Sequence, residues 1–231
     1  LDEKPAGRLY VGVCSPGRGA VSPPIRIWSS LLQNAEDLRQ KNAGIIDNDL
    51  DYYWSLVGYF NATRELANFR SAYRSDVRQA IKNIASRAGS ADRVLDDSNL
   101  IELHSNMIDK NEISSVLKRL EKQKIDAILA TSMFGTGVDI DRLSQMVVHG
   151  QPKTTSSYIQ STGRVGRRRG AIVVTFLRST RPRDLDHYEF FTGYHRALNK
   201  FVEPITAYPF SPRAVDRGIL PVFTAILRNA K

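Results

Sequence analysis

Residues 125–170 read IDAILATSMFGTGVDIDRLSQMVVHGQPKTTSSYIQSTGRVGRRRG. The apolar run at residues 125–130 ends in two hydroxyl residues, a pattern that predicts a strand buried on both faces of a parallel sheet. The glycines at 135–137 let the backbone approach a ligand closely or take a positive φ angle. A second apolar run, at residues 146–148, predicts another strand. We therefore expect a strand, a glycine-rich loop and a second strand, in that order.

A short helix expected after the second strand carries the most specific pattern in the chain. Its N-cap oxygens can come from Thr154, Thr155, Ser156 and Ser157. At about 100° per residue, one face holds Tyr158, Thr162 and Val165. The opposite face holds Gln160, Gly163, Arg164 and Arg167. Forked guanidinium groups on such a face can clamp a polyanion, although an arginine-rich face can also simply be solvated.

Taken together, these features resemble motifs V, Va and VI of superfamily 2 helicases. The matching segments are ATSMFGTGVDI, MVVHGQP and QSTGRVGR. The order of strands and motifs over most of the chain resembles the second RecA-like domain of that superfamily. The resemblance implies an α/β fold, with a three-layer parallel sheet flanked by helices. Residues 1–180 would form the RecA-like domain, and residues 181–231 a helical extension packed on it.

The resemblance also implies roles for individual residues. Arg164 and Arg167 match arginine fingers, which neutralise charge on the γ-phosphoryl group in the transition state. Gln160 matches the residue that opens motif VI. The implied ATP contacts are Gly137 and Asp139. The implied nucleic-acid contacts are Thr131 and Ser132, with Asn61, Thr63 and Ser105 as secondary candidates.

Two departures separate the chain from the DEAD-box group of RNA helicases. Motif V reads SMFGTGVDI, and motif VI opens with Gln160-Ser161 instead of His-Arg. The segments GQPKTTSSYIQSTGRVGR, RPRDLDHYE and VGYFNATREL are instead similar to the helicase subunit of DISARM-type bacterial phage-defence systems. This resemblance favours DNA over RNA as the partner.

Composition fits a globular protein that has a polyanionic partner. Across 231 residues, 33 Lys and Arg outnumber 24 Asp and Glu, for a formal net charge of +9. Such a balance suits nucleic acid, and equally an acidic neighbouring domain. The single cysteine, Cys14, excludes an intrachain disulfide and suggests a cytoplasmic protein, in which Cys14 would be a small core residue. No membrane span or signal peptide is visible, and the chain, which starts at Leu1, is expected to be a fragment of a longer protein.

The remaining elements alternate as in a doubly wound parallel sheet. Further strands are expected at residues 9–14, 54–60, 100–103 and 171–177. Further helices are expected at residues 28–41, 62–73, 77–88, 110–123, 184–201 and 212–229. Asn61 and Asp76 are placed to cap helices. Residues 15–19 form either a plain turn or a nest of N–H groups that faces a phosphate beside Arg18.

The chain by itself lacks the parts of a complete catalytic site. It has no G-x-x-x-x-G-K-[ST] loop, no metal-ligand cluster and no hydrolytic triad pattern. The resemblance therefore implies that ATP with Mg²⁺ is bound mainly by an absent first RecA-like domain. We expect an ATP-dependent helicase in the full-length protein and an inactive isolated fragment. The alternatives are a non-catalytic basic module that binds nucleic acid or protein, and a dinucleotide-binding enzyme, for which the G-x-G-x-x-G fingerprint is missing.

Overall fold

The computed structural model describes residues 7–42, 49–104, 115, 116, 118, 119, 125–132, 134, 140–204 and 211–229. Its strands are β1 (Arg8–Cys14), β2 (Leu56–Phe60), β3 (Leu100–Leu103), β4 (Ala127–Ala130), β5 (Gln145–His149) and β6 (Ala171–Leu177). Its α-helices are α1 (Ser22–Lys41), α2 (Thr63–Ala72), α3 (Arg78–Ala88), α6 (Thr155–Thr162), α7 (Pro182–Glu189), α8 (Phe191–Arg196) and α9 (Pro212–Asn229). Short 3-10 helices are found at Leu50–Tyr53, Asp97–Asn99 and Leu198–Phe201.

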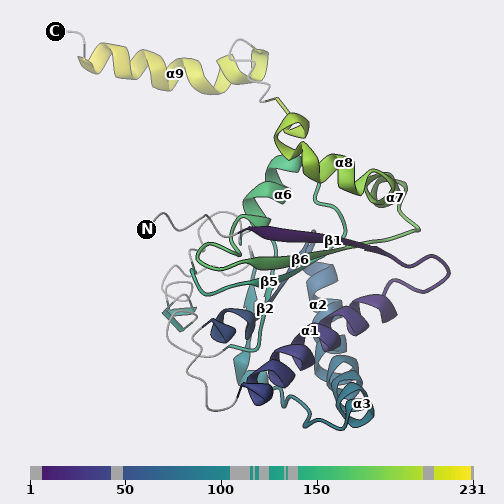
Figure 1. Cartoon of the computed structure of the whole chain (residues 1–231). Helices are drawn as coiled ribbons and strands as arrows, with labels where there is room; N and C mark the ends of the chain where they lie inside the picture. Colours follow the sequence, from purple (N-terminus) through teal and green to yellow (C-terminus); the bar gives the residue numbers. More distant parts are fainter. Residues whose placement is uncertain are drawn as a thin grey trace, which may run out of the picture.

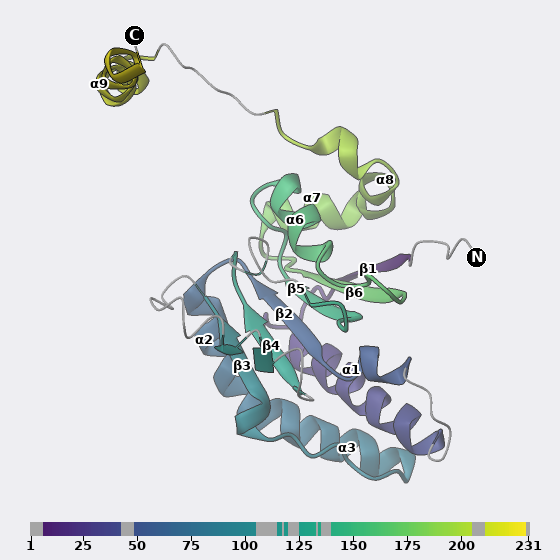
Figure 2. The same cartoon turned by 90° about the vertical axis from the view of Figure 1, so that its left-hand side faces the viewer.

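The strands form one six-stranded sheet in the order β1-β6-β5-β2-β4-β3. Every neighbouring pair is parallel. Helices α1, α2 and α3 cover one face, and α6, α7 and α8 lie on the other (Figure 1). Figure 2 shows the same layers from the side. This arrangement confirms the predicted three-layer α/β fold, because buried strands of a parallel sheet need helices on both faces.

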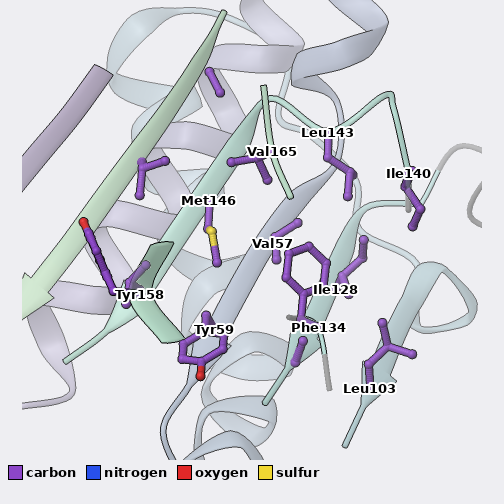
Figure 3. Close-up of a cluster of buried hydrophobic side chains, with 14 of the residues drawn as sticks. Val57, Tyr59, Leu103, Ile128, Phe134, Ile140, Leu143, Met146, Tyr158 and Val165 are labelled. Carbon is purple, nitrogen blue, oxygen red and sulfur yellow. The ribbon is translucent and has the colours of Figure 1, made fainter. Parts of the chain in front are cut away.

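A separate cluster of buried hydrophobic side chains lies on each face of the sheet. Toward α1 to α3, the indole of Trp28 is fully buried and packs so closely that a Cβ at Gly58 would lie 2.4 Å from its ring. Toward α6, Val57, Met146 and Tyr158 belong to the second cluster (Figure 3). Alternate residues of β2 point to opposite faces, so a single strand contributes to both cores.

Helix α1 begins six residues earlier than the position predicted from its apolar stripe. Its first turn contains Pro23 and Pro24. Proline is tolerated there, because the first N–H groups of a helix have no intrahelical acceptor. Within the predicted bounds, Trp28, Leu32 and Ala35 are buried, as a helix with one apolar face requires.

The two helices expected between residues 62 and 88 are joined without a break. A π-helical turn, Tyr73–Val77, links α2 to α3. The predicted capping role of Asp76 is therefore wrong, since no side chain caps the start of α3. The predicted core position of Cys14 is also only half right, because its side chain is half-buried on the edge strand.

The C-terminal part differs most from its predicted form. The single aromatic-rich helix expected at residues 184–201 is divided into α7, α8 and a 3-10 turn, and α7 contacts β1 and β6. Helix α9 has the predicted bounds and contains no buried residue. Within the described residues, no helix is long and apolar enough to cross a membrane. The division into domains at residue 180 stays a prediction.

A buried histidine, His149, is the last residue of β5 and lies against the core. His149 is 3% exposed, and its Nε2 accepts a hydrogen bond of 3.0 Å from Nε1 of Trp28. Burial, and to a smaller extent the nearby positive charge of Arg178, lowers the pKa of His149 to about 3. The imidazole is therefore neutral in the folded protein, with its proton on Nδ1.

This histidine should make the protein sensitive to acid. In the unfolded chain its pKa is about 6.5, so below that pH the unfolded state binds a proton that the folded state does not. The free energy of unfolding should then fall by roughly 1.4 kcal/mol per pH unit between pH 6 and pH 4. Urea unfolding over this range can measure the slope. His149→Gln keeps an acceptor for Trp28 but cannot titrate, so equal slopes in both proteins would contradict the prediction.

Candidate functional site

The carboxyl ends of the central strands meet at one edge of the sheet. Gly150 follows β5, Asn61 follows β2, Arg178 follows β6 and Thr131 follows β4. In open α/β sheets, ligands bind outside this edge. The structure thus brings together residues that are far apart in the sequence.

Helix α6 starts at this edge with two caps. The side chain of Thr154 accepts a hydrogen bond of 3.1 Å from the backbone N–H of Ser157, which confirms the predicted N-cap. The carboxylate of Glu203 also accepts from the N–H of Thr155, at 2.7 and 3.0 Å. This backbone hydrogen bond is the main reason that the pKa of Glu203 is lowered. A carboxylate here is also favoured by the helix dipole.

The inner face of α6 is anchored through Tyr158. This side chain is fully buried, and its hydroxyl lies 3.0 Å from Oγ1 of Thr175 and 2.9 Å from Nε2 of His195. The three groups come from α6, β6 and α8. Because they satisfy one another away from water, they fix how α6 sits on the sheet.

Helix α6 ends at Thr162, earlier than the sequence pattern suggests, so Arg164 and Arg167 lie on the turn that follows it and not on its outer face. Gly166 takes a φ angle of +69°, which ends any helical path at that point. A tight turn instead joins the backbone N–H of Arg164 to the carbonyl of Ser161 at 3.1 Å. The predicted helical face for the arginines is therefore wrong.

The turn is held from two sides. Arg8, on β1, donates from Nε to the carbonyl of Val165 at 2.8 Å and from Nη2 to that of Gly163 at 3.2 Å. The N–H of Gly166 donates to the carbonyl of Leu143 at 2.7 Å. The side chain of Val165 is fully buried (Figure 3). The backbone that carries the two arginines is thus fixed to neighbouring elements.

The side chains of this segment reach solvent to different extents. Gln160 and Arg167 are exposed, and Arg164 is half-buried. The adjacent Arg168 pairs with Asp141, with Nη2 2.6 Å from Oδ2. The three predicted catalytic side chains therefore share one short segment, in which Gln160 and Arg167 are exposed to solvent.

A substitution at Gly166 tests how strictly this turn is determined. Gly166→Ala would strain the positive φ angle and would bring a Cβ within 2.7 Å of the Cβ of Ala171. We expect the free energy of unfolding to fall by about 1–3 kcal/mol, as for other strained backbone positions. Thermal or urea unfolding can measure this. The matched control is Gly218→Ala in α9, where a Cβ meets nothing within 4 Å, and an equal loss there would contradict the prediction.

A second network joins the ends of β5, β2 and β6. The amide of Asn61 donates to the carbonyls of His149 and Gly150, both at 3.2 Å. Its predicted capping role is wrong, because Ala62 is the N-cap of α2 and no side chain caps that helix. The buried carboxylate of Asp184 accepts from the N–H groups of Gln151 and Arg178, at 3.1 and 3.0 Å. These bonds fix the loops at the edge of the sheet.

Three further predicted nucleic-acid contacts, Thr131, Ser132 and Thr63, follow strands β4 and β2 at the same edge. Thr131 is buried, and its Oγ1 has no hydrogen-bond partner among the described residues. Ser132 is exposed, and Thr63 is half-buried at the start of α2. Ser105, Gly137 and Asp139 lie outside the described residues.

Basic groups gather where β6 ends. Glu65 Oε1 is shared by Arg178 Nη1 at 3.1 Å and Arg181 Nη2 at 2.6 Å. Two guanidinium groups thus face one carboxylate, and the carboxylate of Asp184, which accepts from the backbone N–H of Arg178, balances the second positive charge. Over the described parts of the chain, no group of three or more His, Cys, Asp or Glu side chains could hold a metal ion.

Comparison with known families identifies the fold and its motifs. Residues 71–169 match the family described as the helicase conserved C-terminal domain. Residues 71–169 of this chain thus carry a helicase C-terminal domain, and the sheet has the RecA-like fold of such domains. Within this helicase domain, the matched region runs from the end of α2 through residues 163–167, the turn that carries Arg164 and Arg167 and is called the arginine turn below.

Relatives and solved structures extend this result. The helicase domain is 41% identical over 233 residues to the DISARM protein DrmA of Bacillus paralicheniformis, covering 99% of this chain and 20% of DrmA. It thus spans about a fifth of that relative. The crystal structure of the DUF1998 helicase MrfA, bound to DNA and AMPPNP, matches with a TM-score of 0.64 and 16% identity, over 91% of this chain and 26% of MrfA. S. cerevisiae Dbp5 bound to RNA and ADP BeF3 matches with a TM-score of 0.54 and 12% identity, over 97% of this chain and 46% of Dbp5.

Several residues that build the site were not predicted to do so. Arg8, Glu65, Asp184 and Glu203 make long-range contacts to the edge loops or to the arginine turn. No local pattern marks them, because each acts on a segment that is distant in the sequence. For Arg178 and Arg181, the sequence does show a local signal, because three arginines, Arg178, Arg181 and Arg183, closely follow β6.

Proposed function

We propose that this helicase domain is the C-terminal motor half of an ATP-dependent superfamily 2 helicase or translocase. In this role Arg164 and Arg167 are arginine fingers, and Gln160 helps to order the γ-phosphate side of the nucleotide. The observation that carries the proposal is the arginine turn, clamped by Arg8 and Leu143, with Arg167 exposed. A fixed backbone is what a finger needs, since its effect depends on position.

The chemistry of the segment fits the oxygens of a triphosphate. Each guanidinium presents forked N–H donors, and such pairs with phosphate are often bidentate. ATP supplies the phosphoryl group that is transferred, and Mg²⁺ would be held mainly by a first RecA-like domain. The part of this chain is to stabilise the developing negative charge through Arg164 and Arg167. Gly137 and Asp139 are proposed ATP contacts.

We propose that nucleic acid is the polymer along which this motor moves. The proposed contacts are Thr131 and Ser132, with Asn61, Thr63 and Ser105 as secondary ones. The net charge of +9 supports a polyanionic partner. We propose DNA over RNA as the partner, from the resemblance of the motif segments to DISARM helicase subunits and from the 41% identity to DrmA. Residues 181–231 would be an extension of the motor domain, and the single cysteine, Cys14, supports a cytoplasmic location.

The test is the ATPase activity of a protein that also contains the first RecA-like domain. Single-stranded DNA should stimulate hydrolysis strongly, and RNA of matched sequence should stimulate it less. The present chain alone should neither hydrolyse ATP nor bind it tightly. Binding of DNA without any ATP hydrolysis by the longer protein would instead favour the non-catalytic basic module.

A further inference from the structure

A small pocket opens at the carboxyl edge of the sheet, between the start of α1 and helix α2. Its volume is about 190 Å³, and it is lined by apolar groups of Val21, Pro24, Phe60 and Phe69 and by the polar groups of Glu65 and Arg178. Pockets for drug-sized ligands usually have about 300–1,000 Å³. This pocket is therefore suited to a single ring system.

The floor of the pocket is aromatic. The ring of Phe60 stacks on His149, with centroids 4.1 Å apart, and lies 5.5 Å from the ring of Phe69. All three side chains are less than a tenth exposed and held by packing. Rigid aromatic and apolar walls suit a planar ligand, because they lose little conformational freedom on binding.

The polar side of the pocket holds an unsatisfied acceptor beside an unsatisfied donor. Glu65 Oε1 already accepts from Arg178 and Arg181. Glu65 Oε2 and Arg178 Nε are buried and have no hydrogen-bond partner among the described residues. Buried polar atoms without partners are costly, and the terminal torsion angle of Glu is broad enough to turn an oxygen toward a ligand.

The same groups argue against a phosphate in this pocket. Pro23 and Pro24 carry no backbone N–H, so the start of α1 offers few donors to an anion. The carboxylate of Glu65 would repel a phosphate. A neutral ring whose edge offers an N–H group next to an acceptor fits both unsatisfied atoms.

We infer that this pocket receives one base of a bound strand, turned out from its neighbours. The base lies against the apolar wall, donates an N–H to Glu65 and accepts from Arg178. The inference rests on the proposed function, because the strand must run along the edge that holds Asn61 and Thr63. Bases splayed out of single strands are commonly held in this way, by packing together with edge hydrogen bonds.

The test is to fill the pocket with larger side chains, by substitution in a protein that contains both RecA-like domains. Asn68→Leu adds bulk at the exposed mouth, and Ala72→Leu adds it at the wall. The matched control is Ser71→Leu, which is exposed on the same helix and does not line the pocket. Binding of fluorescent single-stranded DNA is measured at about 0.5 M salt, where phosphate contacts are much weaker.

Both pocket variants should bind intact strands about tenfold more weakly, which is the scale of one stacked base, and Ser71→Leu should bind like wild type. The loss should disappear on a strand of abasic sites, which keeps the phosphates. Competition by free guanosine would show that a free base is also accepted. Wild-type affinity in Asn68→Leu would overturn the inference but leave the proposed function intact. Absence of binding to any strand at low salt would overturn both.

Discussion

Arg167→Ala, in a protein that contains both RecA-like domains, should lower nucleic-acid-stimulated ATP hydrolysis by about 10³- to 10⁵-fold. The side chain is exposed on a turn whose backbone is fixed by Arg8. In its proposed role as a finger, its loss would leave the charge of the transition state without this donor. Arg164→Ala should have an effect of the same kind. Arg167→Lys should recover only part of the activity, because an ammonium group lacks the planar fork.

The measurement needs a control for the loss of one positive charge. Arg168→Ala removes a neighbouring guanidinium that already pairs with Asp141, at 2.6 Å. It should leave hydrolysis nearly unchanged. Binding to single-stranded DNA should stay largely intact in all of these variants. Unchanged hydrolysis in Arg167→Ala, or an equal loss in Arg168→Ala, would rule out the assignment of Arg167 as a finger.

Asp126→Ala should destabilise the fold by about 3–5 kcal/mol, the usual cost of leaving a buried charge unpaired. Asp126 and Arg93 are each 3% exposed and are joined by a bond of 2.8 Å. The guanidinium of Arg93 also lies 3.8 Å from the ring of Trp54. Burial lowers the pKa of Arg93, although its bond to Asp126 opposes this. Urea unfolding can measure the change as a lower midpoint with an unchanged slope.

Two further variants test whether the loss comes from leaving a buried charge unpaired. One replaces both partners of this pair, and the other breaks an exposed ion pair. Replacing both partners, as Arg93→Met with Asp126→Leu, should recover much of the loss, because a buried ion pair contributes little net stability over apolar groups. Asp97→Ala breaks the exposed pair between Arg78 and Asp97 and should cost far less. A loss in Asp126→Ala no larger than in Asp97→Ala would contradict the argument.

Sequence reasoning found the strands and the motifs, because both leave local patterns. The bounds of β3 and β6 match the predicted runs. A short apolar segment between turn signals is typical of a strand buried on both faces of a parallel sheet. The cap at Thr154 was equally local. Prediction failed where a helix met a constraint from elsewhere. Helix α6 ends at Thr162 because the next residues bond to Arg8 and Leu143.

The sequence by itself determined the fold class, the strand positions and the set of candidate residues, Gln160, Arg164 and Arg167 among them. Tertiary structure alone decided how those side chains are presented. It placed both arginines on a turn with a fixed backbone, and it lets the amide of Asn61 donate a hydrogen bond to the carbonyl at the end of β5. It also brought Glu65 and Arg178 to one pocket. The physical reason is that periodicity and capping act within a few residues. Contacts between residues more than a hundred positions apart depend on which strands the sheet places side by side.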